Sequence, residues 1–256
     1  MGASDMTSPT RRAVTVRPVA TLSIAAAWLM AVLAAPLQAN GADAARKLSF
    51  DVFLDDRAIG YQRFSLTPAG DATRIETQAR FEVKLLRITA FAYDHRNTEL
   101  WRGGCLRSID AATDSNGKKS AVNGRARGDA FVVTTKEGER TLGDCVASFA
   151  YWDKGVLLRS KTLLNSQTGE YVPVQIAPLG PTTKRIGARD IPVKRYALKG
   201  KGIDITLAYA AGSDEWVALD SKMDGGRTLR YRRSAAELEL LAASPAPRGG
   251  GPTTGG

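Results

Sequence analysis

The chain has 256 residues and carries 36 lysine and arginine residues against 26 aspartate and glutamate residues, a formal net charge of +10 at pH 7. A positive field of this size favours anionic partners, such as phospholipid headgroups or acidic polymers. One histidine and two cysteines in the whole sequence do not supply the compact set of three or four ligands that a metal site needs. We therefore expect no metal site, and no motif in the sequence points to a cofactor.

Residues 1–44 have the pattern of a secretory signal peptide. A basic region precedes the apolar stretch 19–35, and small residues at Ala42 and Ala44 provide a cleavage site for a signal peptidase. We expect cleavage after Ala44. The apolar stretch is about 17 residues long, near the lower limit for a membrane-spanning helix, so an uncleaved anchor is the alternative.

Export determines the cellular location of the protein and limits the classes of molecule that it can bind. No further apolar span follows residue 44 in the sequence, so we expect a periplasmic or secreted protein with no membrane span in the mature chain. Nucleic acid is a poor partner for an exported protein, and the sequence lacks nucleic-acid-binding signatures. This reasoning favours a lipid or an anionic component of the cell envelope as the partner.

Both cysteines, Cys105 and Cys145, lie in the exported part of the chain. An even pair of cysteines in an oxidising compartment predicts a disulfide. The chain-entropy model gives a closed loop of this length about 4 kcal/mol of stabilisation. A redox couple is the alternative, but no neighbouring motif indicates an activated thiolate.

After the signal peptide, the sequence reads as a succession of antiparallel strands. In residues 74–84, apolar and small residues at odd positions alternate with charged and polar residues at even positions. This period of two predicts a strand with one covered face and one solvated face. Similar patterns cover residues 47–54, 60–67, 88–101, 130–135, 171–176, 191–198, 202–210, 215–223 and 227–233.

Dipeptides that favour tight turns stand between these strands. They are Asn116-Gly117, Asn123-Gly124, Glu137-Gly138, Thr168-Gly169 and Asp224-Gly225. We therefore predict a mainly β fold, a curved antiparallel sheet or half-barrel with one or two short helices. Residues 45–241 are expected to form the single domain, and residues 242–256 a disordered tail.

Two segments favour short helices. Residues 144–151 begin with a potential N-cap at Asp144. Residues 234–244 are rich in alanine, leucine and glutamate, which are good helix formers. Both helices would lie between or after strands.

The run 95–118 starts with the only histidine of the chain. On an alternating strand, His95 shares a face with Asn97, Glu99 and Trp101. A strand and a hairpin account for this run, so we expect a structural or surface role for His95 rather than a role as a general base or ligand. No nucleophile elbow or phosphate-binding loop is present, and we assign no catalytic residue. A pair of carboxylates for hydrolysis stays open, because such acids need not be close in sequence.

Basic residues accumulate in the C-terminal third of the chain. We predict an anion-facing surface formed by Lys184, Arg185, Arg189, Lys194, Arg195, Arg230 and Arg232. The alternative is that these charges belong to solvated strand faces and protected sheet edges.

Aromatic residues cluster after Cys145. Phe149, Tyr151 and Trp152 lie close together in the sequence, and Trp101 and Trp216 lie on predicted strands. We expect them to pack in the core or on a sheet face rather than to form a ligand cage.

Five motifs follow one another along the exported part: ELW (99–101), TDSNGK (113–118), SFAYWDKGVLL (148–158), LLNSQTGEYVPVQI (163–176) and YAAGSDEWVALDSKMDGGRTLRY (209–231). Together they resemble an uncharacterised family of exported Gram-negative bacterial proteins, a domain of unknown function. The resemblance implies a curved antiparallel sheet that wraps a central helix, as in periplasmic lipoprotein carriers. Such a likeness concerns the fold and does not by itself establish function.

The expected function is non-enzymatic binding. The concave face of the sheet would hold an apolar ligand or a lipid-bearing partner, with basic residues near the rim. The alternatives are an envelope hydrolase that uses carboxylates and a structural or interaction module. A cavity of about 300 to 1,000 Å³, the size that small ligands need, would favour the binding hypothesis.

Overall fold

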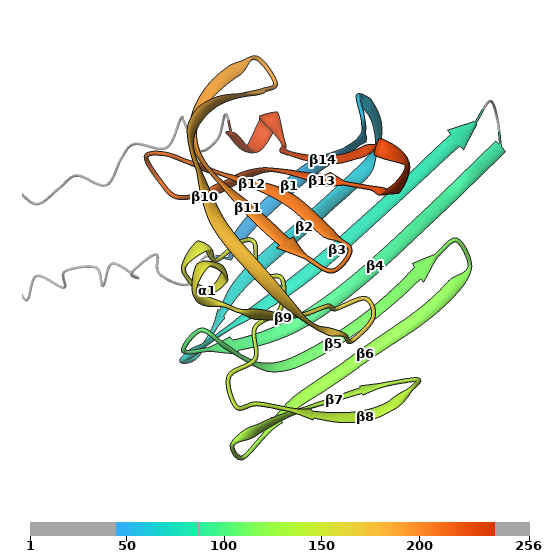
Figure 1. Ribbon diagram of the computed structural model, residues 1–256, viewed down its shortest axis with the longest axis vertical. Coiled ribbons are helices and arrows are strands. Elements are labelled where there is room, and N and C mark those ends of the chain that lie inside the picture. Colours follow the sequence, from blue (N-terminus) through green and yellow to red (C-terminus); the bar gives the residue numbers. More distant parts are fainter. Residues whose placement is uncertain (1–44, 86–87, 239–256) are drawn as a thin grey trace, which may run out of the picture. The chain divides into compact units, whose positions relative to one another are not determined.

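The computed structural model describes residues 45–85 and 88–238 of the chain. Within these ranges the chain forms one antiparallel sheet of 14 strands (Figure 1). This architecture confirms the predicted fold class. The predicted signal peptide and the predicted tail lie outside the described residues.

The elements follow one another in this order: β1 (Arg46–Leu54), β2 (Arg57–Ala69), β3 (Ala72–Leu85), β4 (Ile88–Arg102), β5 (Cys105–Ser115), β6 (Lys118–Arg127), β7 (Ala130–Thr135), β8 (Gly138–Leu142), α1 (Lys154–Arg159), β9 (Thr162–Leu164), β10 (Tyr171–Ile186), β11 (Arg189–Gly200), β12 (Ile203–Ala210), β13 (Trp216–Lys222), the 3-10 helix η2 (Asp224–Gly226) and β14 (Thr228–Arg233). No helix within the described ranges is both long and apolar enough to cross a membrane.

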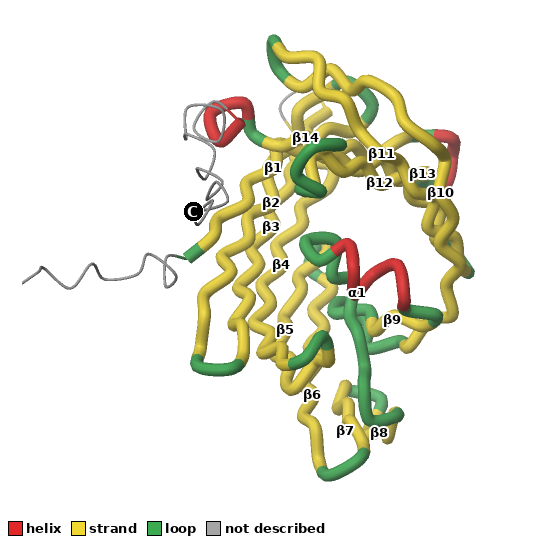
Figure 2. Tube along the Cα trace, turned by 90° about the vertical axis from the view of Figure 1, so that its left-hand side faces the viewer, coloured by secondary structure: helices red, strands yellow, loops and turns green. Residues whose placement is uncertain are grey.

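The sheet consists of two meanders. Strands β1 to β8 lie side by side in sequence order, and so do strands β9 to β14. The meanders join where β1 pairs with β14, with Val52 opposite Tyr231. Residues 143–170, here called the covering segment, lead from the edge strand β8 through α1 and β9 to β10. The sheet curves, and α1 lies on its concave side (Figure 2).

Strand β3 shows how the alternating sequence builds the two faces. Ile75, Ala79 and Phe81 are buried on the concave face, whereas Glu76 and Glu82 point to solvent. The predicted alternation over residues 74–84 is therefore confirmed. Successive side chains of a strand point to opposite faces, so a strand with a period of two has one covered face.

A second, smaller core lies on the outer face of the sheet. Strands β10 and β11 form a long hairpin with a bulge between Pro178 and Gly180. Beyond the bulge, Ile186 and Val193 pack against Ala208 and Val217, which belong to β12 and β13. The strand predicted at residues 171–176 is confirmed, and it is longer than its sequence pattern indicates, since β10 continues through the bulge to Ile186.

The helix predicted at residues 144–151 is absent from the structure, where this segment is irregular, with bends at 144–145, a single bridge at 148 and a turn at 151. Val146, Ser148 and Ala150 are all buried, and Ser148 forms a bridge to Leu164. These tertiary contacts outweigh the local helix preference of the segment.

The short helix α1 begins a few residues later. Its N-cap is Asp153, whose Oδ1 accepts a hydrogen bond from the backbone N–H of Val156 at 2.8 Å. Of the second predicted helix, residues 234–244, the structure shows 235–238 as helical and Ser234 as irregular, and residues 239–244 lie outside the described ranges. For α1, the sequence contains an N-cap residue, Asp153, that our prediction does not use.

Asn123-Gly124 lies inside β6 rather than in the predicted turn. A β-carbon on Gly124 would lie 2.5 Å from Cε1 of Phe131, so glycine leaves the room that this aromatic ring occupies. Asn116-Gly117, in contrast, forms a turn, with φ angles of 55° and 86°. Two positive φ angles are what a two-residue hairpin loop of type I′ requires.

Candidate functional site

A cavity of about 250 Å³ lies between the concave face of the sheet and the covering segment. One side is formed by β2, β3 and β4, and the opposite side by β12, β13 and β14. The lining is completed by two parts of the covering segment: Ser148, Phe149, Tyr151 and Trp152, and residues 165–167. Strands from both meanders are therefore needed to form this cavity.

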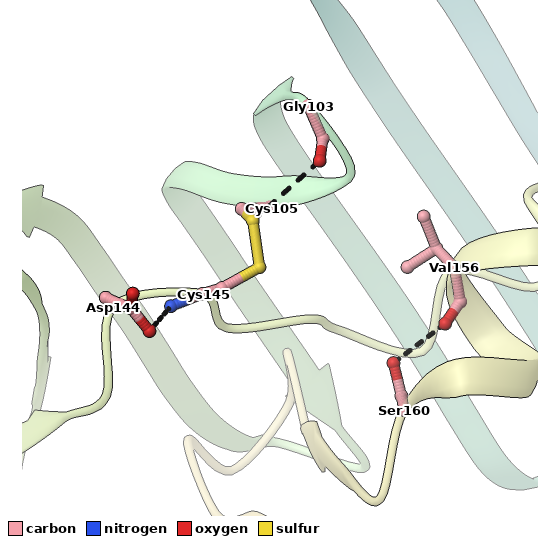
Figure 3. The surroundings of a disulfide bond; sticks show 6 residues. All are labelled: Gly103, Cys105, Asp144, Cys145, Val156 and Ser160. Carbon is pink, nitrogen blue, oxygen red and sulfur yellow. Dashed lines mark hydrogen bonds between the residues drawn. A yellow bond between two sulfur atoms is a disulfide. The ribbon is translucent and has the colours of Figure 1, made fainter.

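The disulfide helps to hold the covering segment in place (Figure 3). Cys105 at the start of β5 is bonded to Cys145, with 4.9 Å between their Cα atoms, which confirms the predicted pair. Beside the bond, the backbone N–H of Leu106 donates to the carbonyl oxygen of Val146 at 2.8 Å. The covering segment is thus tied to the sheet just before it reaches the cavity.

Strand β4 supplies the polar floor of the cavity. His95, Asn97 and Glu99 share its inner face, as their spacing predicts, and they are 4%, 7% and 3% exposed. The register places Ala79 opposite His95 and Ala111 opposite Asn97. Because these alanine side chains are small, they leave space beside the polar side chains of β4, and this part of the sheet face is less tightly packed.

His95 is held by two hydroxyl groups. Its Nδ1 lies 2.8 Å from Oγ1 of Thr113 on β5, and its Nε2 lies 3.4 Å from Oγ of Ser166 in the covering segment. Burial lowers the pKa of His95 to about 4, although the nearby Asp94 acts in the opposite direction. The imidazole is therefore uncharged at neutral pH.

The contact between Ser166 and His95 resembles the serine–histidine pair of a catalytic triad, but the third member, a carboxylate next to the histidine, is replaced by a hydroxyl group. In a catalytic triad a carboxylate orients the histidine and stabilises its charged form. Here the hydroxyl of Thr113 takes that position, and the low pKa makes His95 a weak base. The arrangement is suited to hydrogen bonding rather than to proton abstraction.

Glu99 is a buried carboxyl group held by neutral donors. Its Oε1 accepts from Nδ2 of Asn97 at 2.9 Å, and its Oε2 accepts from Nε1 of Trp101 at 2.7 Å. Burial raises the pKa of Glu99, and hydrogen bonds from Asn97, Trp101 and the Ser148 hydroxyl partly offset this effect. Among the described residues, no lysine or arginine forms an ion pair with it.

Aromatic rings form much of the cavity wall. Phe81 stacks on Tyr93 with ring centroids 5.0 Å apart and meets Tyr231 edge to face at 6.1 Å. Burial raises the pKa of both tyrosines, so their phenol groups stay neutral. Because these rings come from β3, β4 and β14, they connect the two meanders across the cavity.

The aromatic side chains of the covering segment border both the cavity and the core. Phe149, Tyr151 and Trp152 line the cavity and are partly buried, and they also pack against the core. Trp101 and Trp216, which are 4% and 1% exposed, belong to that core, so the expected core packing is confirmed for all five side chains. The covering segment places its three aromatic side chains against the cavity.

The residues of the predicted anion-facing surface do not line the cavity. Lys184 and Arg232 both form ion pairs with Asp220, each at 2.6 Å. Arg185 pairs with Asp190, and Arg230 pairs with Asp56. Neighbouring carboxylates therefore neutralise part of this charge.

The other members of that surface lie on β11. For Arg189, Lys194 and Arg195, the described residues provide no ion pair within 4.0 Å. An anion-facing role for the seven residues remains a prediction, and it concerns a surface other than the cavity.

Metal binding receives no support from the part of the chain that the structure describes, where no group of three or more histidine, cysteine, aspartate or glutamate side chains could hold an ion. The cavity instead offers hydrogen-bond acceptors and aromatic surface. The sequence predicts that His95, Asn97 and Glu99 share one face of a strand, but it does not indicate a site there. The available signal was a run of three polar residues on a face that is otherwise apolar.

The fold and the cavity define a protein built from a single curved antiparallel sheet, whose concave face is covered by its own crossing segment. The chain belongs to the family described as Domain of unknown function (DUF6134), which matches residues 50–234. The match extends from β1 to the end of β14 and includes every element that lines the cavity. A search among curated proteins finds no match.

Proposed function

We propose that this chain is a binding protein of the bacterial cell envelope, exported to the periplasm by residues 1–44, which holds a small ligand in the cavity on its concave sheet face. The observation that carries the proposal is the cavity itself, about 250 Å³ in volume, with aromatic walls and a polar floor. Ligand pockets in proteins are typically apolar concavities with a few polar groups that orient the ligand.

The volume of the cavity limits the size of the ligand that it can hold. Its volume of about 250 Å³ lies just below the range of about 300 to 1,000 Å³ for pockets that hold drug-sized molecules. A compact molecule, or one end of a longer lipid, fits this space better than a complete acyl lipid. The covering segment would have to move before the concave face could accept a long chain.

Binding is favoured over carboxylate-based hydrolysis for a chemical reason. Glycoside hydrolysis of the usual kind needs two carboxyl groups on either side of the scissile bond. Within the described lining of the cavity, Glu99 is the one carboxyl group. The lining therefore supports recognition of a ligand more directly than acid–base chemistry on it.

A cavity-filling variant tests the proposal. Ala79 lines the cavity and is 2% exposed, so Ala79→Leu should fill much of the space in front of His95. Ala112→Leu is the matched control, because Ala112 is exposed on the outer face of β5. The probe is the uncharged fluorophore N-phenyl-1-naphthylamine, whose emission rises when it enters an apolar site.

We expect the unaltered protein and Ala112→Leu to bind the probe, and Ala79→Leu to bind it at least about ten-fold more weakly. Organic extraction of protein purified from the periplasm, followed by mass spectrometry, should recover a small molecule from the first two proteins. Equal probe binding by all three proteins, or no probe and no extract from any of them, would refute the cavity as a ligand site.

Export is tested separately. The mature protein isolated from the periplasmic fraction should begin at Ala45, which N-terminal sequencing can determine. A chain that retains Met1 and stays with the cell membrane would instead support the uncleaved anchor.

A further inference from the structure

On the basis of the binding function proposed above, we propose that the ligand carries a positively charged amino group, which Glu99 and the side-chain oxygen of Asn97 recognise at the floor of the cavity. The rest of the ligand would be a compact apolar or aromatic body that contacts the ring-lined wall. This assignment gives the cavity a preference for cations, although the protein as a whole is basic.

The first reason for this inference is the set of charged groups that line the cavity. Its described lining contains no lysine and no arginine, in a chain with 36 of them. His95 is uncharged at neutral pH, so Glu99 is the group that can carry a charge there. Burial raises the pKa of Glu99, and a partner that brings one positive charge would favour its ionised form and offset the cost of burying the carboxylate.

An unused acceptor carries the second part. Asn97 is 7% exposed, and its Nδ2 donates to Glu99. Its Oδ1 is buried and has no hydrogen-bond donor among the described residues. Buried polar atoms are almost always paired, so this oxygen marks a place for a donor from outside the chain. An ammonium group has three N–H donors and can serve Asn97 and Glu99 together.

The aromatic wall carries the third part. Phe81 contacts both Tyr93 and Tyr231, and the three rings line the same cavity as Glu99 and Asn97. Tyr93 lies four residues before Asn97 on β4, so these rings face the body of a ligand whose ammonium group lies at Asn97 and Glu99. An amine with a compact apolar body can therefore place its charge at the polar floor and its body against the rings.

Three probes of similar shape test the charge preference on the unaltered mature protein. They are 2-phenylethylammonium, 2-phenylethanol and 3-phenylpropanoate, which are cationic, neutral and anionic. Isothermal titration calorimetry should show that the ammonium binds at least about ten-fold more tightly than the alcohol. The carboxylate should show no measurable binding.

Two variants connect this preference to the floor of the cavity. Glu99→Gln removes the charge and keeps the size, so it should weaken ammonium binding about ten-fold and leave alcohol binding within about two-fold. Glu76→Gln is the matched control, because Glu76 is exposed on the outer face of β3, and it should change neither affinity. Thermal melts establish that both variants are folded, and the comparison of probes on the unaltered protein does not depend on either variant.

The outcomes separate this inference from the proposed function. If the alcohol or the carboxylate binds as tightly as the ammonium, the preference for cations is overturned while the cavity remains a binding site. If none of the three probes binds although N-phenyl-1-naphthylamine does, the preference is likewise overturned. If Ala79→Leu also leaves the naphthylamine signal unchanged, the proposed function fails as well.

Discussion

Two parts of the same concave sheet face are equally buried but differ in what they bury. Around β1 and β13, Phe50 lies against Trp216 with ring centroids 4.0 Å apart, and Phe64 packs edge to face on both rings. Around β4, His95 and Asn97 are just as inaccessible but line a cavity. Low solvent exposure is therefore found both in a packed core and at the floor of a cavity.

The difference comes from the size and polarity of the facing side chains. In the packed part, which we call the aromatic core, Phe50 and Trp216 pack against each other, and Phe64 packs on both where the core borders the cavity. In the cavity part, small residues such as Ala79 and Thr77 stand beside the polar residues of β4. Buried polar side chains need partners, and in the cavity part these partners include hydroxyl groups of the covering segment.

Truncating one ring in each part should show the largest difference. Phe50→Ala is expected to cost about 5 kcal/mol, the upper end of the range for emptying a buried aromatic site, because Phe50 is enclosed by the aromatic core. Phe81→Ala should cost about 3 kcal/mol, since Phe81 already faces open space. Urea unfolding measures both values. A larger loss for Phe81 would contradict the distinction between core and cavity.

Removing the disulfide should loosen the cavity part more than the core. The bond between Cys105 and Cys145 spans 40 residues, and the double substitution to serine is expected to lower stability by about 4 kcal/mol. Hydrogen exchange should rise most at the backbone of residues 143–152 and least near Phe50. Uniform protection across the sheet in the double variant would show that the covering segment does not depend on this bond.

His95 should make the stability of the cavity part depend on pH. Its pKa falls from 6.5 to about 4 on folding, so between these values the unfolded chain binds a proton that the folded protein excludes. Stability is unaffected above pH 6.5 and falls by about 3 kcal/mol as the pH decreases to 4. Urea midpoints of the unaltered protein and His95→Gln, measured from pH 7 to 4, should differ in slope over this interval. Parallel profiles would contradict a buried neutral imidazole.

The smallest effect is expected on the outer face. Glu82 is exposed on β3, where it accepts a hydrogen bond from Thr89 and forms a surface ion pair with Lys84. Exposed pairs of this kind contribute little, so Glu82→Ala should change the free energy of unfolding by less than about 0.5 kcal/mol. A loss comparable to that of Phe81→Ala would mean that both faces of β3 are covered in solution.

The helix and turn errors show where local sequence stops being informative. Residues 144–151 have an acceptable helix sequence, but they form the bond to Cys105 and the bridge from Ser148 to Leu164 in an irregular conformation. Gly124 follows an asparagine as in a hairpin loop, yet it serves to admit Phe131 from the next strand. In both places, contacts with distant residues outweigh a modest local preference.

By itself, the sequence determined the features that depend on local patterns or on the number of cysteines. These are the period of two in β3, the disulfide partners, the Asn116-Gly117 turn and a mainly β fold. It also placed His95, Asn97 and Glu99 on one face. Only the tertiary structure decided that this face borders a cavity, because β12 to β14 and the covering segment supply the opposite side. The free space in front of a strand depends on side chains from distant parts of the chain, and no local pattern records how closely they approach.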